Sequence, residues 1–477
     1  MADQAKDEAA SGWDSAAQAW FDHSTAKRID TDVVIARTLV QQYPALQLVI
    51  APPVSNLSLL AYAQAGHAQC TPIEDKHSNV FSPLSWTVYL PPLRRIDGSS
   101  GALGEKVNFG KFAYNWRGHD FILYIVDGRD GTNPAYGTTR NHYILTAERK
   151  HADALLLAAG SWSNELHGEI WVFDQGYWQK SAELYRSISG ASWNNVILDE
   201  DMKQAIIDDH ISFFTSRDTY ARLKVPWKRG VIYHGPPGNG KTISIKATMH
   251  MLYALKDPVP TLYVRSLSSF SGPEYSIKSI FDKARQLAPC YLVLEDLDSL
   301  VSDRVRSYFL NEVDGLKSND GIFMVGSTNH LDLLDPGIAK RPSRFDRKYF
   351  FPDPDLEQRI AYCKFWQGKL TDNKDVEFPD KLCKAIAEIT DKFSFAYIQE
   401  AFVAALLAIA RRSGDGKRLS AESLTRDVGD GWLDVRSVNG GGDDDDLDDL
   451  VLWVEIKKQI ETLREGIDDE EKNTRGV

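Results

Sequence analysis

The chain has 477 residues, and its 55 basic and 67 acidic side chains give a formal net charge of −12. This length is enough for two or three domains, and a hydrophobic content of 43% lets each of them bury a core. The acidic balance argues against a general nucleic-acid-binding protein, which would carry a basic face, so we expect no nucleic-acid partner.

Residues 1–25 are acidic and rich in alanine, and we expect them to form a disordered tail. They have neither the apolar core of a secretory signal nor the arginine-rich composition of a transit peptide. The longest apolar run, Ala401–Ala410, is about half of the ~20 residues that span a membrane, so we expect no membrane span. The four cysteines lack metal-ligand spacing and suit a reducing compartment, which predicts a cytoplasmic or nuclear location.

Residues 26–190 are predicted to form an N-terminal domain that binds a substrate or partner. Apolar runs at Phe121–Asp127 and His142–Thr146 indicate strands, and the spacing over 151–166 indicates a helix. A further strand is expected at Glu169–Asp174. This succession is typical of an α/β or α+β domain.

Residues 191–352 have a different pattern, in which short apolar strands alternate with helical stretches. The strands are expected at Val231–His234, Thr261–Val264, Tyr291–Leu294 and Ile322–Gly326. This alternation predicts βαβ units and a parallel sheet. Together with the phosphate-binding loop described below, it gives the expected fold class: the α/β parallel sheet of a P-loop NTPase. Residues 353–432 are predicted to form a helical lid.

Residues 433–447 contain the run GGGDDDD and are predicted to form an acidic linker. Residues 448–477 are expected to form an amphipathic helix and a tail, because apolar residues recur at three and four positions. These are Leu450, Trp453, Ile456, Ile460 and Leu463. Docking on the body of the protein is the usual fate of such a helix, and a contact with a neighbouring subunit or partner is the alternative.

A phosphate-binding loop is predicted at Gly235–Thr242, where GPPGNGKT fits the pattern G-x-x-x-x-G-K-[ST]. The glycines let the backbone direct N–H groups at phosphate, and the helix that follows adds its positive end. Lys241 would hold the β- and γ-phosphates, and Thr242 would bind Mg²⁺. The expected ATP contacts are Gly235, Pro236, Pro237, Gly238, Asn239, Gly240, Lys241 and Thr242.

An acidic pair, Glu295 and Asp296, follows a predicted strand about 50 residues after this loop. Open α/β sheets bind ligands at the carboxyl ends of their strands, so both side chains are expected at the site. One carboxylate can hold the Mg²⁺ shell while the next orients and deprotonates the attacking water. Alone the pair is a weak signal, because many strands end in solvated carboxylates. At about 50 residues after a phosphate loop it becomes a strong signal.

Together these motifs resemble those of the AAA family of ATPases. GPPGNGKT is similar to the Walker A motif and LEDLD to Walker B, and Asn311–Gly315 and Gly326–Asn329 follow in family order. Residues 333–347 (LLDPGIAKRPSRFDR) resemble the second region of homology, the most specific of these signals. The resemblance covers roughly residues 190–430.

The resemblance implies roles for residues outside the phosphate loop. Asn329 matches the sensor that helps to place the attacking water, and Arg344 and Arg347 match the arginine fingers. In the family these arginines reach the ATP of a neighbouring subunit, where a guanidinium offsets charge on the transferring phosphoryl group. The resemblance therefore implies a homo-oligomeric ring of six or seven subunits that uses ATP and Mg²⁺. By position, Glu295 takes the metal and Asp296 the catalytic role.

Three departures from the family pattern stand out. The acidic order is Glu-Asp, where Asp-Glu is usual; the mitochondrial translocase of the Rieske iron–sulfur protein has a similar order and a similar Thr328-Asn329-His330, but it carries a membrane span. Ser343 stands where the arginine loop usually has glycine. Phe270-Ser271-Gly272 occupies the place of the pore loop, and Phe270 is expected either to grip a client or simply to pack.

The leading hypothesis is a ring-forming motor that remodels or translocates a protein client. One alternative is a scaffold or switch that binds ATP and hydrolyses it slowly, which the Glu-Asp order favours. A small-molecule phosphotransferase is the other, and it would need an acceptor site but no arginine from a neighbour. The sequence does not identify the client.

Overall fold

The computed structural model describes residues 31–52, 57–73, 83–92, 98, 100–128, 139–314, 317–341, 344–373, 376–413 and 447–474. The predicted tail, Ser343 and all of the predicted acidic linker except Leu447 lie outside these residues. The chain divides into two compact units, Met1–Leu166 and His167–Val477.

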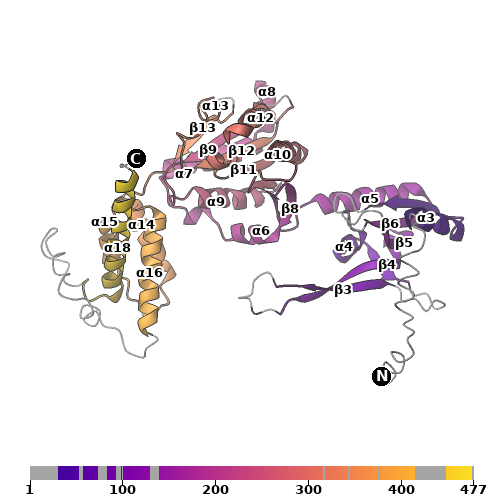
Figure 1. The fold of residues 1–477 in the computed structure, drawn as a ribbon, viewed down its shortest axis with the longest axis horizontal. Coiled ribbons are helices and arrows are strands. Elements are labelled where there is room, and N and C mark those ends of the chain that lie inside the picture. Colours follow the sequence, from indigo (N-terminus) through magenta and orange to yellow (C-terminus); the bar gives the residue numbers. More distant parts are fainter. Residues whose placement is uncertain are drawn as a thin grey trace, which may run out of the picture. The chain divides into compact units, whose positions relative to one another are not determined.

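The N-terminal unit is built on a six-stranded antiparallel sheet in the order β1-β6-β5-β4-β2, with β3 also paired to β4 (Figure 1). It has the α+β character expected from its sequence. Its strands are β1 (Gln47–Ala51), β2 (Gln69–Pro72), β3 (Leu84–Leu90), β4 (Ala102–Trp116), β5 (His119–Gly128) and β6 (Thr139–Thr146), and its helices are α3 (Thr31–Gln42), α4 (Leu59–Gln64) and α5 (Arg149–Asn164).

Helices cover both faces of this sheet. On one face, α5 buries Ala152, Leu155 and Ala159, which recur at helical spacing, against strand residues such as Leu123 and Ile144. On the other face, Leu39 of α3 packs with Tyr143 and its neighbours. Because successive strand residues point to opposite faces, the sheet supplies side chains to both of these clusters.

The second unit contains a seven-stranded sheet in the order β13-β9-β12-β11-β10-β7-β8. All neighbouring pairs are parallel except the hairpin of β7 and β8. The strands are β7 (Ile170–Asp174), β8 (Tyr177–Ser181), β9 (Arg229–His234), β10 (Thr261–Val264), β11 (Cys290–Leu294), β12 (Ile322–Thr328) and β13 (Arg347–Phe350). The parallel sheet predicted from the sequence is thus present.

The hairpin of β7 and β8 differs from the expected domain organisation. The sequence placed residues up to 190 in the N-terminal domain. In the structure β7 pairs with β10, so residues 167–190 belong to the second unit. Strand β7 has four buried residues out of five and needs a neighbour on each side of its backbone. Strand β10 supplies one neighbour and β8 the other.

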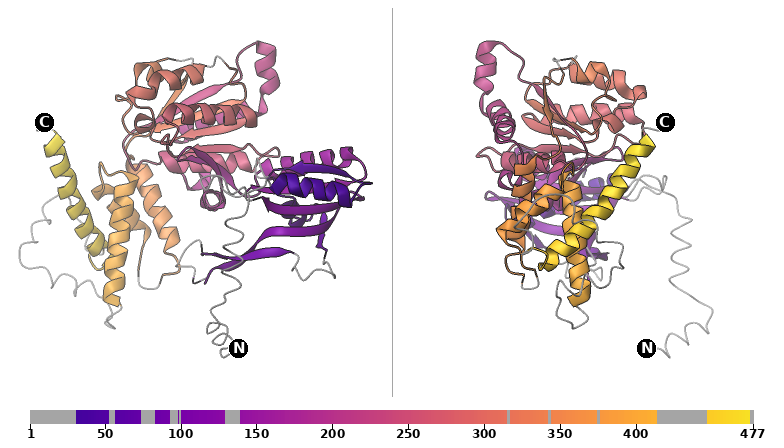
Figure 2. Two further views of the ribbon diagram at one scale, coloured as in Figure 1. Left: turned by 45° about the vertical axis from the view of Figure 1, so that its right-hand side comes forward. Right: turned by 90° about the vertical axis from the view of Figure 1, so that its left-hand side faces the viewer.

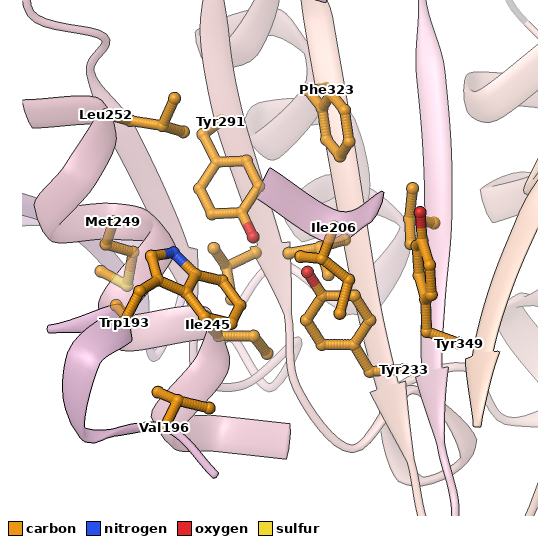
Figure 3. Close-up of a cluster of buried hydrophobic side chains, with 14 of the residues drawn as sticks. Trp193, Val196, Ile206, Tyr233, Ile245, Met249, Leu252, Tyr291, Phe323 and Tyr349 are labelled. Atoms are coloured by element: carbon orange, nitrogen blue, oxygen red, sulfur yellow. The ribbon is translucent and has the colours of Figure 1, made fainter. Parts of the chain in front are cut away.

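Helices surround the second sheet. They are α6 (Ala182–Ser189), α7 (Glu200–Thr215), α8 (Arg217–Leu223), α9 (Lys241–Tyr253), α10 (Pro273–Leu287), α11 (Leu297–Leu300), α12 (Asp303–Asp314) and α13 (Pro336–Ala339), with a 3₁₀ turn at Trp193–Asn195. Every residue of β11 and β12 is buried, as expected for parallel strands covered on both faces. Figure 3 shows one of these cores, where Tyr233, Tyr291 and Phe323 from the strands meet Ile206, Ile245 and Leu252 from helices.

The lid consists of α14 (Leu356–Lys369), α15 (Asp380–Ile389), α16 (Phe395–Ser413) and α18 (Val451–Thr474). Leu452, Trp453, Ile456 and Ile460 of α18 are buried in one core with Phe402 and other lid residues. Figure 2 shows α18 alongside the other lid helices. The C-terminal amphipathic helix therefore docks on the body of its own chain, as expected.

Three of the four cysteines, at positions 290, 363 and 383, are buried as free thiols, and Cys70 is partly buried. They pack as small apolar side chains. Within the described ranges, no helix combines the length and apolar character that crossing a membrane requires.

Candidate nucleotide-binding and catalytic site

The predicted phosphate loop connects β9 to α9 at the carboxyl edge of the parallel sheet. Gly235, Gly238 and Gly240 have φ values of +140°, +82° and +92°, which side chains rarely adopt. A Cβ atom on Gly235 would lie 2.3 Å from the carbonyl oxygen of Phe351, and one on Gly238 would lie 2.6 Å from Cβ of Ala396. Glycine is therefore required at both positions by backbone conformation and by space.

Helix α9 begins at Lys241 and presents its first backbone N–H groups to the loop. Its N-cap is Gly240, and no side chain in the described part of the chain caps it. The first N–H groups of a helix have no partner inside the helix and carry its positive end. This combination suits the binding of phosphate.

Lys241 is held within the loop. Its side chain is 8% exposed, and Nζ donates to the carbonyl oxygens of Gly235 and Pro236, both at 2.8 Å. Burial lowers the pKa of Lys241, while the nearby carboxylate of Asp296 acts in the opposite direction. The loop follows β9 and the acidic pair follows β11, so both lie at the carboxyl edge of the same parallel sheet.

Asn239 and the lid fix the other side of the loop. Asn239 is buried and donates from Nδ2 to Asp353 Oδ1 at 2.8 Å. The N–H of Ala396, at the start of α16, donates to the carbonyl oxygen of Gly238 at 3.2 Å. The lid thus contacts the loop directly, a role for Ala396 that the motif analysis missed because its backbone N–H carries no sequence signal.

The acidic pair follows β11, and the two carboxylates lie in different environments. Glu295 is half-buried, and its Oε2 accepts a hydrogen bond from the hydroxyl of Tyr263. Asp296 is exposed and has φ of +50° and ψ of +54°, the left-handed region. Such a conformation is uncommon for a residue with a side chain and is concentrated at functional sites. A hollow of about 500 Å³ adjoins both carboxylates and is also lined by Tyr263 and Arg265.

Asn329 follows the last residue of β12, the strand between β9 and β11. The preceding Thr328 is fully buried, donates to Asp298 Oδ1 at 2.7 Å, and accepts from the N–H of His330 at 2.9 Å. These bonds fix the backbone on both sides of Asn329. The loop, Asn329 and the acidic pair thus follow three adjacent parallel strands.

Arg344 is engaged within its own chain. Its side chain is 7% exposed, and its guanidinium donates to both carboxylate oxygens of Asp314, at 2.8 and 2.6 Å, and to the carbonyl oxygen of Gly337 at 2.6 Å. This bidentate pair raises the pKa of Arg344 and lowers that of Asp314. Arg344 thus ties its loop to the end of α12.

Arg347 is more accessible. Its side chain is 49% exposed and lies 3.2 Å from Asp209 on α7. Asp209 also pairs with Arg229 at 3.5 Å and accepts a hydrogen bond from Tyr349, whose pKa is raised to about 12, chiefly by burial and then by that bond. Arg347 therefore shares a carboxylate with two other groups.

Phe270 lies before α10, in the predicted position of the pore loop, and its side chain is fully exposed. Gly272 has φ of +90° and accepts a hydrogen bond from Ser269 Oγ at 2.8 Å, which closes the turn. The hypothesis that Phe270 merely packs is therefore wrong for the isolated chain.

Residues 231–353 match the protein family described as "ATPase family associated with various cellular activities (AAA)". These residues form an AAA ATPase domain. The matched range begins in β9 and ends after β13, so it includes the phosphate loop, the acidic pair, Asn329 and both arginines. It does not single out the branch of the Rieske-protein translocase.

The AAA domain gives the site its class: an ATP-binding site of a family of ATPases. The residues present also fit ATP with Mg²⁺. The loop backbone forms a cradle that a Cβ atom would fill at Gly235 and Gly238, and Glu295 Oε1 is buried with no hydrogen-bond partner among the described residues. Such a carboxylate oxygen suits a cation and its bound water.

Proposed function

We propose that this protein is a ring-forming ATPase that uses ATP and Mg²⁺ to remodel or translocate a protein client. The observation that carries the proposal is the arrangement of the AAA domain. The phosphate loop, the acidic pair and Asn329 follow β9, β11 and β12, three neighbouring strands whose carboxyl ends share one edge. That edge is where open α/β sheets bind their ligands.

In this proposal each residue of the site has a defined task. The backbone N–H groups of the loop and Lys241 hold the phosphates, and Thr242 and Glu295 hold the Mg²⁺ shell. Bound Mg²⁺ would offset negative charge on the phosphates. Asp296 accepts the proton of the attacking water, which Asn329 helps to orient. Asp is shorter than the usual Glu, and the backbone of Asp296 lies in the left-handed region.

The ring would complete each site with an arginine from the next subunit. Arg347 is the better placed of the two candidates, because it is half-exposed and shares its carboxylate partner with other groups. Arg344 is nearly buried and pairs with Asp314, so it ties its own loop to the end of α12. A guanidinium that reaches the neighbouring ATP would stabilise charge on the transferring phosphoryl group.

The client would meet two parts of the chain. The N-terminal unit would select it, and the exposed Phe270 would contact it, since a protruding aromatic ring buries apolar surface only when a partner covers it. The acidic order and Thr328-Asn329-His330 support a relationship to the Rieske-translocase branch. That relationship does not extend to its substrate.

The test is ATP turnover per subunit over a wide range of protein concentration, with Asp296→Asn as the blank. If neighbours complete the sites, specific activity rises with concentration and then saturates. Mixing Arg347→Ala with Asp296→Asn subunits then restores part of the activity, because each supplies what the other lacks. Arg344→Ala serves as the comparison, and thermal unfolding shows whether its loop has collapsed.

Two other results would point to different functions. Activity well above the blank in a monomer, unchanged by Arg347→Ala, would exclude shared sites and favour a phosphotransferase, which added acceptor molecules would then stimulate. ATP binding without turnover at any concentration would favour a nucleotide-dependent scaffold or switch. The unusual acidic order is the feature that keeps this second alternative open.

A further inference from the structure

Tyr263 contacts the proposed metal-binding carboxylate from a neighbouring strand. It is the third residue of β10 and pairs in register with Val293 of β11, two residues before Glu295. Its hydroxyl donates to Glu295 Oε2. The ring packs against the core of the sheet, so the hydroxyl has little freedom to move.

The two oxygens of Glu295 are therefore in different situations. Oε2 is engaged by Tyr263, whereas Oε1 is buried with no hydrogen-bond partner in the part of the chain described. A buried carboxylate oxygen without a donor is destabilising unless a cation or a water bound to it comes into contact. Glu295 also lines the hollow of about 500 Å³, next to Asp296.

The departure from the usual acidic order explains why this carboxylate needs support. A glutamate has one more rotatable bond than the aspartate that usually stands there, so its carboxylate can occupy more positions. A hydrogen bond to one oxygen selects among those positions. The same bond leaves the other oxygen available to a metal ion.

We propose that Tyr263 is a positioning residue for Glu295, holding Oε2 so that Oε1 faces the Mg²⁺ that accompanies ATP. This inference rests on the proposed function, because it concerns the metal of the same site. It assigns Tyr263 no contact with the nucleotide. Removing the hydroxyl should weaken the use of Mg²⁺ and leave metal-free ATP binding alone.

The test measures binding and not turnover. In the full-length chain carrying Asp296→Asn, so that ATP is not consumed, a fluorescent ATP analogue is titrated with and without Mg²⁺. Mn²⁺ binding in the presence of ATP is followed by electron paramagnetic resonance. Tyr263→Phe keeps the ring and is expected to raise the half-saturating metal concentration roughly tenfold, the effect of one charge-assisted hydrogen bond.

Two further variants make the result specific. Tyr291→Phe removes a buried tyrosine hydroxyl from the adjacent strand, whereas the bond to Glu295 comes from Tyr263, so this variant should leave metal affinity unchanged. Glu295→Gln should itself weaken metal binding. Adding Tyr263→Phe to it should have little further effect, because the tyrosine acts through that carboxylate.

A metal requirement that Tyr263→Phe leaves unchanged would overturn the inference while the proposed function stands, provided that the parent chain binds Mg²⁺-ATP. An equal loss of ATP affinity with and without Mg²⁺ would also overturn it, since the hydroxyl would then only support the fold. If the parent chain shows no metal-dependent ATP binding, the proposed function fails, and the inference fails with it.

Discussion

The parallel sheet of the AAA-containing unit and the antiparallel sheet of the N-terminal unit bring their strand ends together differently. In the parallel sheet, the carboxyl ends of β9, β11 and β12 meet at one edge, so residues from distant positions in the chain gather there. In the antiparallel sheet, neighbouring strands run in opposite directions, so carboxyl ends alternate between the two edges. Motifs that follow strands therefore locate a site in the parallel sheet but not in the antiparallel one.

Burial follows the same contrast. Strand β11 is buried at all five positions, whereas β4 alternates buried with partly exposed residues over its second half. The N-terminal sheet also has a hollow, of about 570 Å³, and among the described residues that line it Asp120 is the only acidic one. Size alone does not distinguish the two hollows; the chemistry of their lining does.

Lys241→Ala should have the largest effect on ATP binding. Unchanged ATP affinity in this variant would contradict the assignment of the site to the parallel sheet. Loss of the charge that faces the phosphates should reduce ATP affinity by a factor on the order of 1,000. Isothermal titration with ATP measures this change. Lys150→Ala, an exposed lysine on α5 of the N-terminal unit, is the matched control and should bind ATP as the parent does.

Asp296→Asn should lower ATP turnover about 100-fold while ATP affinity is retained, because an amide cannot accept the proton of the attacking water. Asp120→Asn changes the acidic residue of the other hollow and should leave turnover unaltered. A steady-state phosphate-release assay compares the two. Equal losses would show that the sheet edge is not where hydrolysis occurs.

Each unit contains a buried histidine, and acid should destabilise both. Burial is the main cause that lowers the pKa of His142 and His210 from 6.5 to about 4. The folded state therefore binds fewer protons than the unfolded state, and stability present above pH 6.5 is lost as the pH falls towards 4. At pH 5.5 the loss is about 1–2 kcal/mol for each histidine.

Denaturant unfolding at pH 7.5 and pH 5.5 measures this loss. His210→Gln should reduce the acid sensitivity of the second unit only, and His142→Gln that of the N-terminal unit only. A variant whose pH dependence equals that of the parent would show that its histidine has the same pKa in the folded and unfolded states.

The smallest expected effect comes from a matched pair of core truncations. Ile206→Val on α7 and Ile144→Val on β6 each remove one methylene group from a fully buried side chain. Each should cost its own unit about 1 kcal/mol of unfolding free energy. Calorimetry would show whether one transition moves while the other stays, and a common shift would indicate that the two units unfold together.

The sequence predicted those parts of the molecule that local patterns determine. Strands β9 to β12, the phosphate loop and the docking of α18 follow from short apolar runs, fixed glycine positions and helical spacing. The pairing of β7 with β10 could not be read in this way, because strand partners are chosen by packing between distant segments.

The same limit applies within the site. The motif named Glu295 but not Tyr263, which is 32 residues away along the chain and meets it only through strand register. It named Arg344 for a contact with another subunit, whereas a bidentate bond to Asp314 occupies that side chain here. A motif specifies residue types in order and does not specify which neighbours they have in space.

The contact between the lid and the phosphate loop lies at one end of α16, so a small rotation there would move the other end of the helix much further. The N–H of Ala396 is bonded to Gly238 at one end of this helix, which has 19 residues, so its far end lies about 28 Å away. A tilt of about 10° at the loop would move that end by about 5 Å. Since α18 packs on α16, a displacement that begins at a phosphate group would be carried mechanically to the C-terminal helix.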